Sequence, residues 1–383
     1  MNDMKTKYAL LALFAIVACE QLETNIVNKE STVKMVENST LNDIAVILTD
    51  IDIDIPLCCE VLQSVQQSVD KGMDENLYFK ELWMNPMDVK VRSIGEESIL
   101  KKRLDEYFNN QLPTRSSDTE NAVKNSDIRL YWPYSENWDG ITMPVIAPAP
   151  RVESDAFYGY KYNKNPDGEF EIEIVLIDDD YAYDNPVWII NYMETPYDAI
   201  SDYSYINKDD LSTRSTGNRY LWEMDRMLVT KQYDKLSNGG SEFDVFVTYP
   251  LIDGHAVGQC HQFYTFTRAQ IRKAKNNDVA VIINSDSRLL NTDWSSVQLS
   301  NHFALYENDG GDASQTVNAG TVGWKDDKTG LSASLTVTHT VKSNDKSLLQ
   351  VNYTRDYYLP LPNDTKHSIS DGTVSWYTNI TKY

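Results

Sequence analysis

The feature that most restricts the fold of this sequence is a series of short strand-like segments in residues 219–383. Each segment is rich in β-branched and aromatic residues, and turn-forming pairs such as Asn238-Gly239, Asp253-Gly254 and Asp371-Gly372 separate the segments. The predicted strands are 220–229, 243–249, 262–266, 279–283, 303–306, 331–340 and 348–357. Regularly spaced strands with one short helix, predicted over 267–274, are typical of a β-sandwich.

The region 40–112 has the periodicity of helices instead. Ser39 and Thr40 can cap a helix over 41–48, and apolar residues recur at three- and four-residue spacings in 58–69 and 98–112. Between residues 51 and 55 isoleucine alternates with aspartate, which is strand periodicity, so strand and helix both stay open there. We therefore predict a mainly helical region over 40–112.

A polar stretch, 113–126, has the composition of a linker, and it precedes a second group of strand patterns in 127–200. Residues 201–218 lack periodicity and are predicted to be a loop or linker. The predicted fold class is thus α+β, with a helical region followed by two β-rich domains, 127–200 and 219–383. Strands in the first of these are predicted at 128–132, 143–150 (an extended edge), 157–162, 170–177 and 186–191.

The chain opens with Lys5 and Lys7 and continues with an apolar run over 8–17, the pattern of a secretory signal peptide. The run is shorter than the roughly 20 residues that a membrane-spanning helix needs. Ile16-Val17-Ala18-Cys19 follows it and resembles the lipobox of bacterial lipoproteins.

The lipobox resemblance implies that a signal peptidase recognises residues 16–18 and cuts before Cys19. The Cys19 thiol would carry diacylglycerol, and fatty acids such as palmitate would complete the anchor. Two or more acyl chains hold a protein stably at a membrane, and residues 19–39 would form a flexible tether. An ordinary signal peptide (residues 1–18) with a chance cysteine is the alternative.

Charge and cysteine content bear on the possible partners and on disulfide formation. The net charge is −22, and removal of residues 1–18, with two lysines and one aspartate, changes it to about −23. Such a protein repels nucleic acid, which we exclude as a partner. Once Cys19 is lipidated, Cys58, Cys59 and Cys260 are left. We favour free thiols, and a bridge between Cys260 and one of the adjacent pair is the alternative.

Four further stretches carry a family resemblance: residues 128–137, 185–191, 239–243 and 305–309. Together with the lipobox they resemble uncharacterised Bacteroidota-type envelope lipoproteins over most of the chain. The resemblance implies a cell-envelope location at the outer membrane, on its periplasmic or its surface-exposed side. Glu20 and Glu23, close behind the lipidated cysteine, fit the acidic residues that direct such lipoproteins to the cell surface.

No zinc-protease motif, nucleophile elbow or phosphate-binding glycine loop occurs in the sequence. The best candidate site is a set of acidic residues in the last predicted domain, which faintly resembles C2-like domains. Calcium takes six to eight oxygen ligands, and acidic loops rich in asparagine and glycine can supply them. Simple turn geometry is the alternative. The candidate calcium ligands are Asp286, Asp293, Glu307, Asp309 and Asp312.

Two weaker patterns complete the list of candidate sites. His255, Cys260 and His261 are ligand types for zinc, although a hairpin explains their spacing equally well. The acidic, tyrosine-containing run 178–184 suits sugar binding or hydrolysis, with a solvated loop as the alternative. We therefore expect a lipid-anchored, non-catalytic module that binds protein or glycan. An extracytoplasmic hydrolase acting on glycan or peptide is the alternative.

Overall fold

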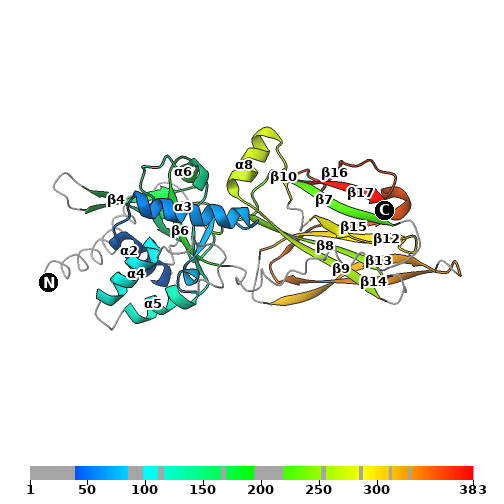
Figure 1. Cartoon of the computed structure of the whole chain (residues 1–383), viewed down its shortest axis with the longest axis horizontal. Helices are drawn as coiled ribbons and strands as arrows, with labels where there is room; N and C mark the ends of the chain where they lie inside the picture. The colour runs from blue at the N-terminus through cyan, green and yellow to red at the C-terminus, as the bar shows by residue number, and fades with distance from the viewer. Residues whose placement is uncertain are drawn as a thin grey trace, which may run out of the picture. The chain divides into compact units, whose positions relative to one another are not determined.

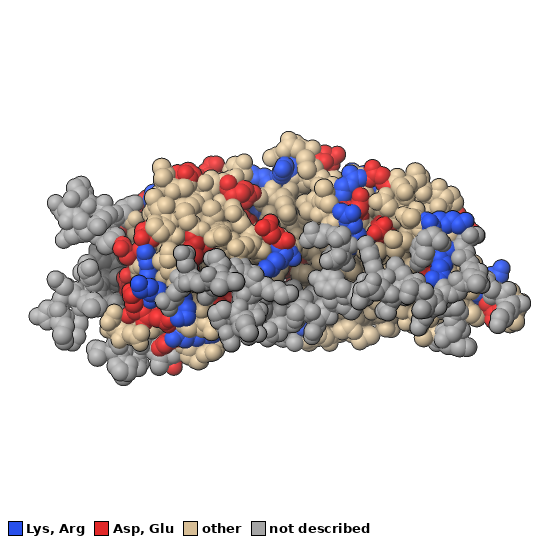
Figure 2. Space-filling view, in the orientation of Figure 1, with Lys and Arg blue, Asp and Glu red and all other residues tan. Residues whose placement is uncertain are grey.

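The computed structural model describes residues 39–84, 98–110, 116–164, 170–193, 219–251, 256–283, 288–309, 313–326 and 329–382. The predicted signal peptide, Cys19, nearly all of the tether and the predicted loop 201–218 lie outside these residues. None of the helices within the described ranges is long and apolar enough to cross a membrane. Figure 2 shows acidic and basic side chains intermingled on one face of the chain, despite its strongly negative total charge.

In the N-terminal part (residues 39–193), four α-helices form within the described residues before 126, and three of them agree with the predicted periodicity. Asp54 caps the second helix by accepting a hydrogen bond from the Leu57 amide at 3.1 Å, and Gly72 (φ 81°) follows its end. Glu60, a residue of the second helix, caps the N-terminus of the third helix, because its carboxylate accepts a hydrogen bond from the Ile99 amide at 2.6 Å. The helices are α2 (Ser39–Asp50), α3 (Ile55–Asp70), α4 (Ile99–Asn110) and α5 (Ser116–Asn125).

Two segments in this part have a structure that differs from the one indicated by their sequence patterns. Residues 51–54 are a short connection between α2 and α3 and form no strand; Ile51 is buried against the helices. Residues 116–125, predicted as linker, form helix α5. Val123 explains the difference, since this one fully buried side chain fixes an otherwise polar helix to the core.

A six-stranded sheet in the order β1-β2-β6-β3-β4-β5 lies beside these helices (Figure 1). Strands β3 and β6 pair in parallel, and the other neighbours are antiparallel. The strands are β1 (Asn76–Tyr78), β2 (Ile128–Tyr131), β3 (Val145–Pro148), β4 (Phe157–Lys164), β5 (Phe170–Ile177) and β6 (Val187–Tyr192). Short helices accompany them: η1 (Phe79–Leu82), η2 (Ser135–Asn137) and α6 (Asp179–Asp184).

Two strands of this sheet correct the sequence interpretation. Strand β1 comes from the region predicted to be helical, and three residues are too few to show a strand pattern. Strand β3 lies between β6 and β4, so the proline-rich segment is not an edge. Pro144 and Pro150 fall outside the strand and Pro148 ends it, which leaves the hydrogen bonds of residues 145–147 intact.

Helices and sheet share one hydrophobic core. Trp132 and Trp188 meet at its centre, with ring centroids 5.7 Å apart and the planes inclined by 66°. Leu236, from the C-terminal part of the chain, is fully buried in the same core. The core therefore depends on residues from both parts of the chain.

The C-terminal part is β-rich, which together with the helices confirms the α+β prediction. Its sheets have the orders β10-β7-β17-β16 (with β11 also on β7), β15-β12-β8-β9 and β13-β14. The strands are β7 (Tyr220–Val229), β8 (Ser241–Pro250), β9 (Val257–Phe266), β10 (Val281–Ile282), β11 (Leu289–Asn291), β12 (Ser300–Glu307), β13 (Ser314–Lys325), β14 (Ser332–Lys342), β15 (Lys346–Thr354), β16 (Thr365–Ser368) and β17 (Val374–Lys382). The helices are α8 (Arg268–Asn277) and α9 (Arg355–Tyr358).

Two of these sheets enclose a second core rich in aromatic residues. Trp222 of β7 lies 5.3 Å from Trp294 and 5.0 Å from Tyr358 between ring centroids, and Phe303 of β12 stacks on Trp376 of β17 at 4.9 Å. On strand β12 the core-facing row is Phe303 and Leu305. Alternation of side chains places Glu307 at the end of this row.

The three cysteines that the structure describes are not paired. Cys58 and Cys260 are buried and Cys59 is exposed, all three as free thiols. Burial raises the pKa of Cys58 to about 12 and of Cys260 to about 11, which makes both unreactive near neutral pH.

Candidate functional site

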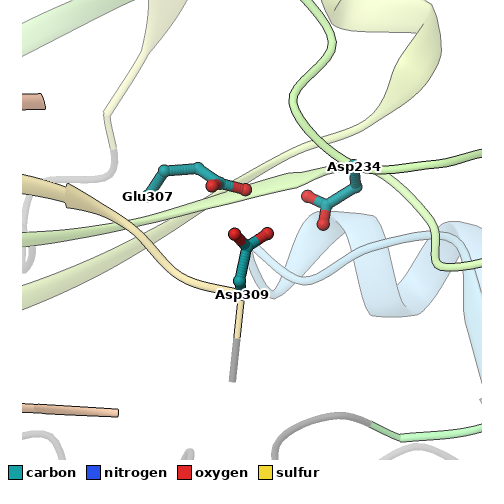
Figure 3. Close-up of side chains that lie close together, drawn as sticks. All are labelled: Asp234, Glu307 and Asp309. Atoms are coloured by element: carbon teal, nitrogen blue, oxygen red, sulfur yellow. The ribbon is translucent and has the colours of Figure 1, made fainter. Parts of the chain in front are cut away.

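Three carboxylates converge where strand β12 ends. Glu307 is its last residue, Asp309 follows directly, and Asp234 comes from the loop between β7 and β8. In Figure 3 the three side chains point toward a common centre. One oxygen from each lies within 4.8 Å of the others. We call Asp234, Glu307 and Asp309 the carboxylate cluster.

Burial makes this cluster unusual. Glu307 is 0% exposed, and its Oε1 atom has no hydrogen-bond partner among the described residues. Asp234 is 6% exposed. A buried carboxylate oxygen without a partner is energetically costly unless a cation or a proton compensates it.

Lys346, the first residue of β15, forms ion pairs with two members of the cluster. Its ammonium group lies 3.3 Å from Glu307 Oε2 and also contacts Asp309, while its side chain stays 60% exposed. Burial and the neighbouring Asp309 raise the pKa of Glu307 to about 7, although Lys346 acts in the opposite direction. When all four groups are ionised the cluster and Lys346 carry a net charge of −2.

The spacing of the cluster suits an ion better than a sugar. Calcium–oxygen distances are about 2.3–2.6 Å, so oxygens on opposite sides of one ion lie up to about 5 Å apart. Retaining glycosidases hold their carboxyl groups about 5–5.5 Å apart on either side of an accessible bond, and inverting ones place them farther apart. A fully buried Glu307 cannot reach a polymer substrate.

The structure brings together only part of the predicted calcium set. Glu307 and Asp309 belong to the cluster, and Asp286 and Asp312 lie outside the described residues. Asp293 instead pairs with Arg219 at 3.3 Å. Asp234 was missed because it lies more than 70 residues before Glu307 in a loop without a metal-binding pattern.

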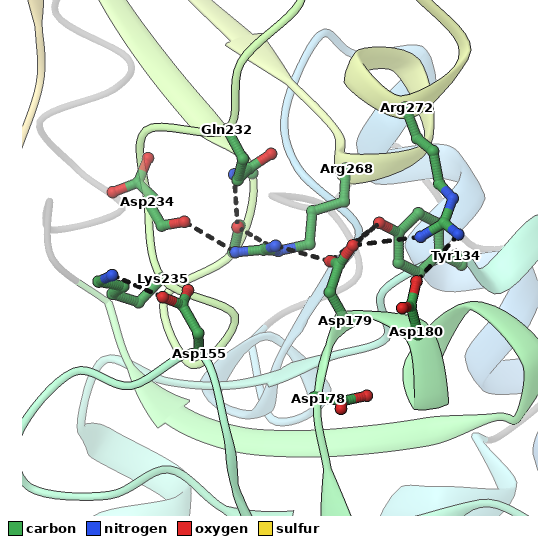
Figure 4. A network of polar contacts seen from close by, with 12 residues as sticks. Tyr134, Asp155, Asp178, Asp179, Asp180, Gln232, Asp234, Lys235, Arg268 and Arg272 are labelled. Carbon is green, nitrogen blue, oxygen red and sulfur yellow. Dashed lines mark hydrogen bonds and ion pairs between the residues drawn. The ribbon is translucent and has the colours of Figure 1, made fainter. Parts of the chain in front are cut away.

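The loop that carries Asp234 is held by charged groups from both parts of the chain (Figure 4). Arg268, 4% exposed, donates to the carbonyl oxygens of Asp234 at 2.8 Å and Gly239 at 3.0 Å. The buried Asp74 accepts from the Gly240 amide at 2.8 Å. Burial raises the pKa of Asp74, whereas the nearby Arg129 lowers it.

The acidic run 178–184 forms helix α6, capped by Asp178, and is not a solvated loop. Asp179 pairs with Arg268 at 2.7 Å and accepts from the Tyr134 hydroxyl at 2.9 Å, and Asp180 pairs with Arg272 at 3.0 Å. Both carboxylates are therefore used in contacts within the protein.

The zinc candidate is not assembled in the described structure. Cys260 and His261 are adjacent on strand β9, so their side chains point to opposite faces. Cys260 donates to the Leu289 carbonyl in the aromatic core, and His261 contacts Asp244 at 2.5 Å on the other face. His255 lies outside the described residues.

His261 belongs to a histidine cluster that the sequence did not reveal. Phe246 stacks between His261 at 4.1 Å and His339 of β14 at 4.7 Å, and His302 lies 5.3 Å from His339. Burial and the two other histidines lower the pKa of His339 to about 4. His339, which its low pKa keeps neutral near neutral pH, thus packs on Phe246 and joins the β8–β12 sheet to the β13–β14 hairpin.

Comparison with known proteins gives no relative: no protein-family model, no curated protein and no solved structure matches this chain.

Proposed function

We propose that this chain is a lipid-anchored protein of the bacterial cell envelope that binds a protein or glycan without catalysing a reaction. We also propose that its C-terminal part, interpreted as a β-sandwich, holds a calcium ion at the carboxylate cluster. The anchor rests on the lipobox-like sequence ending at Cys19. The absence of a catalytic motif, and the use of Asp179 and Asp180 in internal ion pairs, support binding over hydrolysis.

The burial of Glu307 is the main observation in support of the calcium proposal. Its side chain continues a core-facing apolar row, is 0% exposed, and leaves Oε1 facing two further carboxylates. An all-oxygen ligand set favours a hard cation such as calcium or magnesium. Calcium tolerates irregular coordination better than magnesium, which demands nearly octahedral geometry. Three carboxylates from two segments, completed by water, fit calcium.

Thermal unfolding of the full chain in calcium and in EGTA tests the ion site. A ligand at 100 times its Kd stabilises a protein by about 2.7 kcal/mol, which corresponds to about 3 °C in Tm for a domain of this size. We expect calcium to raise the Tm of the wild type by this amount. Equal unfolding temperatures in calcium and EGTA would contradict the site.

Two variants separate the cluster from general charge effects. Glu307→Gln removes a buried ligand and should abolish the calcium-dependent rise in Tm. Asp293→Asn is the matched control, because Asp293 was a sequence candidate but pairs with Arg219. It should lower the Tm equally in calcium and EGTA and leave the calcium effect intact.

The anchor and the partner need separate experiments. Cells grown with labelled palmitate should label the wild type and not Cys19→Ala; label on both would refute lipidation at Cys19. For the partner, the immobilised chain is incubated with glycans and envelope proteins, and retained molecules are analysed for cleavage. Release of shortened glycans or peptides would replace the binding proposal with the hydrolase alternative.

A further inference from the structure

Strand β5 forms an edge of the six-stranded sheet and exposes a row of aliphatic side chains. Among the strands that the structure describes it pairs with β4 alone, over all eight of its residues and without a register shift. Ile172 is 40% exposed, Ile174 46% and Leu176 51%. We call these three residues the β5 strip.

Most of the usual protections of an edge strand are missing from β5, whose charged side chains are Glu171 and Glu173. Natural edges carry lysine, proline, bulges or a covering element, because an unprotected edge pairs with other strands. Strand β5 (Phe-Glu-Ile-Glu-Ile-Val-Leu-Ile) has no lysine, proline or glycine, and its ladder with β4 has no bulge. Such an edge strand can pair with a further strand through its backbone edge.

The apolar surface extends beyond β5 itself. Cross-strand neighbours share a face of the sheet, and the partners of the β5 strip on β4 are Tyr162, Tyr160 and Tyr158. Three tyrosines and three aliphatic residues thus form two adjacent rows. A strand added at the β5 edge would extend this apolar face from two rows to three.

We infer that the β5 edge pairs with the β5 edge of a second copy of this chain, antiparallel and centred on Ile174. In this register Ile174 faces its own counterpart, Ile172 faces the partner's Leu176, and Leu176 faces the partner's Ile172. Each residue of the β5 strip then faces an aliphatic residue of the β5 strip on the other copy. The strip is therefore complementary to itself, which identifies the occupant as a second copy.

The two glutamates of β5 select this register. With Ile174 at the centre, Glu173 faces Val175 and Glu171 faces Ile177 of the other copy. If the pairing were centred on residue 173, two Glu173 carboxylates would face each other, and centring on residue 172 would oppose Glu171 and Glu173. Like charges directly opposite each other destabilise a strand pair.

Disulfide trapping in the full chain tests both the pairing and its register. All variants carry Cys59→Ser, which removes the exposed thiol. Directly opposed residues have Cβ atoms about 4.5–5.5 Å apart, close to the separation that a disulfide needs. We expect Ile174→Cys to form a covalent dimer on mild oxidation, and the Cys59→Ser parent to form none.

Glu173→Cys and Val175→Cys serve as register controls. Neither residue faces its own counterpart, so each variant alone should stay monomeric, whereas an equimolar mixture of the two should cross-link. Equal cross-linking by all three single variants would indicate non-specific contact and overturn the proposal. Cross-linking of Ile174→Cys to a different protein alone would overturn it as well.

Sedimentation measures the same association without cysteines. Ile174→Asp places two carboxylates opposite each other and should weaken dimerisation at least tenfold. Ile282→Asp changes an isoleucine on strand β10 that is more exposed than Ile174, at 67%, and should leave dimerisation unchanged. A wild type that sediments as a monomer at 100 µM or above would refute the dimer.

Discussion

The guanidinium group of Arg268 donates a hydrogen bond to the backbone carbonyl oxygen of Asp234 at 2.8 Å. The same side chain binds Asp179 at 2.7 Å. One buried arginine therefore fixes both the loop that supplies a cluster carboxylate and the helix α6 of the N-terminal part. Loss of this side chain should affect stability and the cation site together.

Arg268→Ala should lower the free energy of unfolding by about 3 kcal/mol, since hydrogen bonds that involve a charged group contribute about 1.5–3 kcal/mol each. Arg272→Ala is the control. Its partners are exposed, so we expect a loss of about 0.5 kcal/mol. Urea unfolding measures both. Equal losses in the two variants would show that burial of Arg268 is unimportant.

His339 should make the fold sensitive to acid. Its pKa is about 4 in the folded chain and 6.5 in the reference state, so below pH 6.5 the unfolded chain takes up a proton that the folded chain does not. The stability that His339 contributes is present above pH 6.5 and is lost as the pH falls toward 4, by about 3 kcal/mol in total.

The variant His339→Phe isolates this effect because it keeps an aromatic ring against Phe246. Its unfolding free energy should fall less than that of the wild type between pH 7 and pH 5. His367, whose pKa burial also lowers to about 4, stays in both proteins and leaves some acid sensitivity. Parallel pH profiles for the two proteins would rule out a role for His339.

Gly240 should not tolerate a side chain. A Cβ atom there would lie 2.2 Å from the Phe266 carbonyl oxygen and 3.1 Å from Asp74 Oδ1. Gly240→Ala should therefore destabilise the chain by about 3 kcal/mol. Gly330→Ala, at φ +73° with no atom within 4 Å of the added Cβ, should lose only about 1 kcal/mol. Thermal unfolding distinguishes the two outcomes.

Elements with clear periodicity were predictable from sequence. Strands β5 and β7 begin and end at the predicted residues, because each is a run of eight or more residues rich in β-branched, aromatic and other apolar side chains. Strand β13 was not predicted, since only Ala319 and Val322 along it are buried and its remaining side chains are partly or fully exposed. Short strands such as β1 and β16 carry too few residues for any period.

The candidate site was predictable only in part. Glu307 and Asp309 lie close together in sequence beside a glycine-rich turn, which is a local signal. Asp234 and Lys346 reach them through pairing of distant segments, and no local pattern records such contacts. The burial of Glu307 likewise depends on the opposite sheet.

The hydrogen bond between the Asp74 carboxylate and the Gly240 amide spans 166 residues of sequence. A chain made from its N-terminus at about 5–20 residues per second completes residue 240 roughly 8 to 33 seconds after residue 74. During that interval the first core also lacks Leu236, and Asp74 lacks one of its donors. The N-terminal part is therefore expected to mature late, and molecules that recognise unfinished chains have that time to act on it.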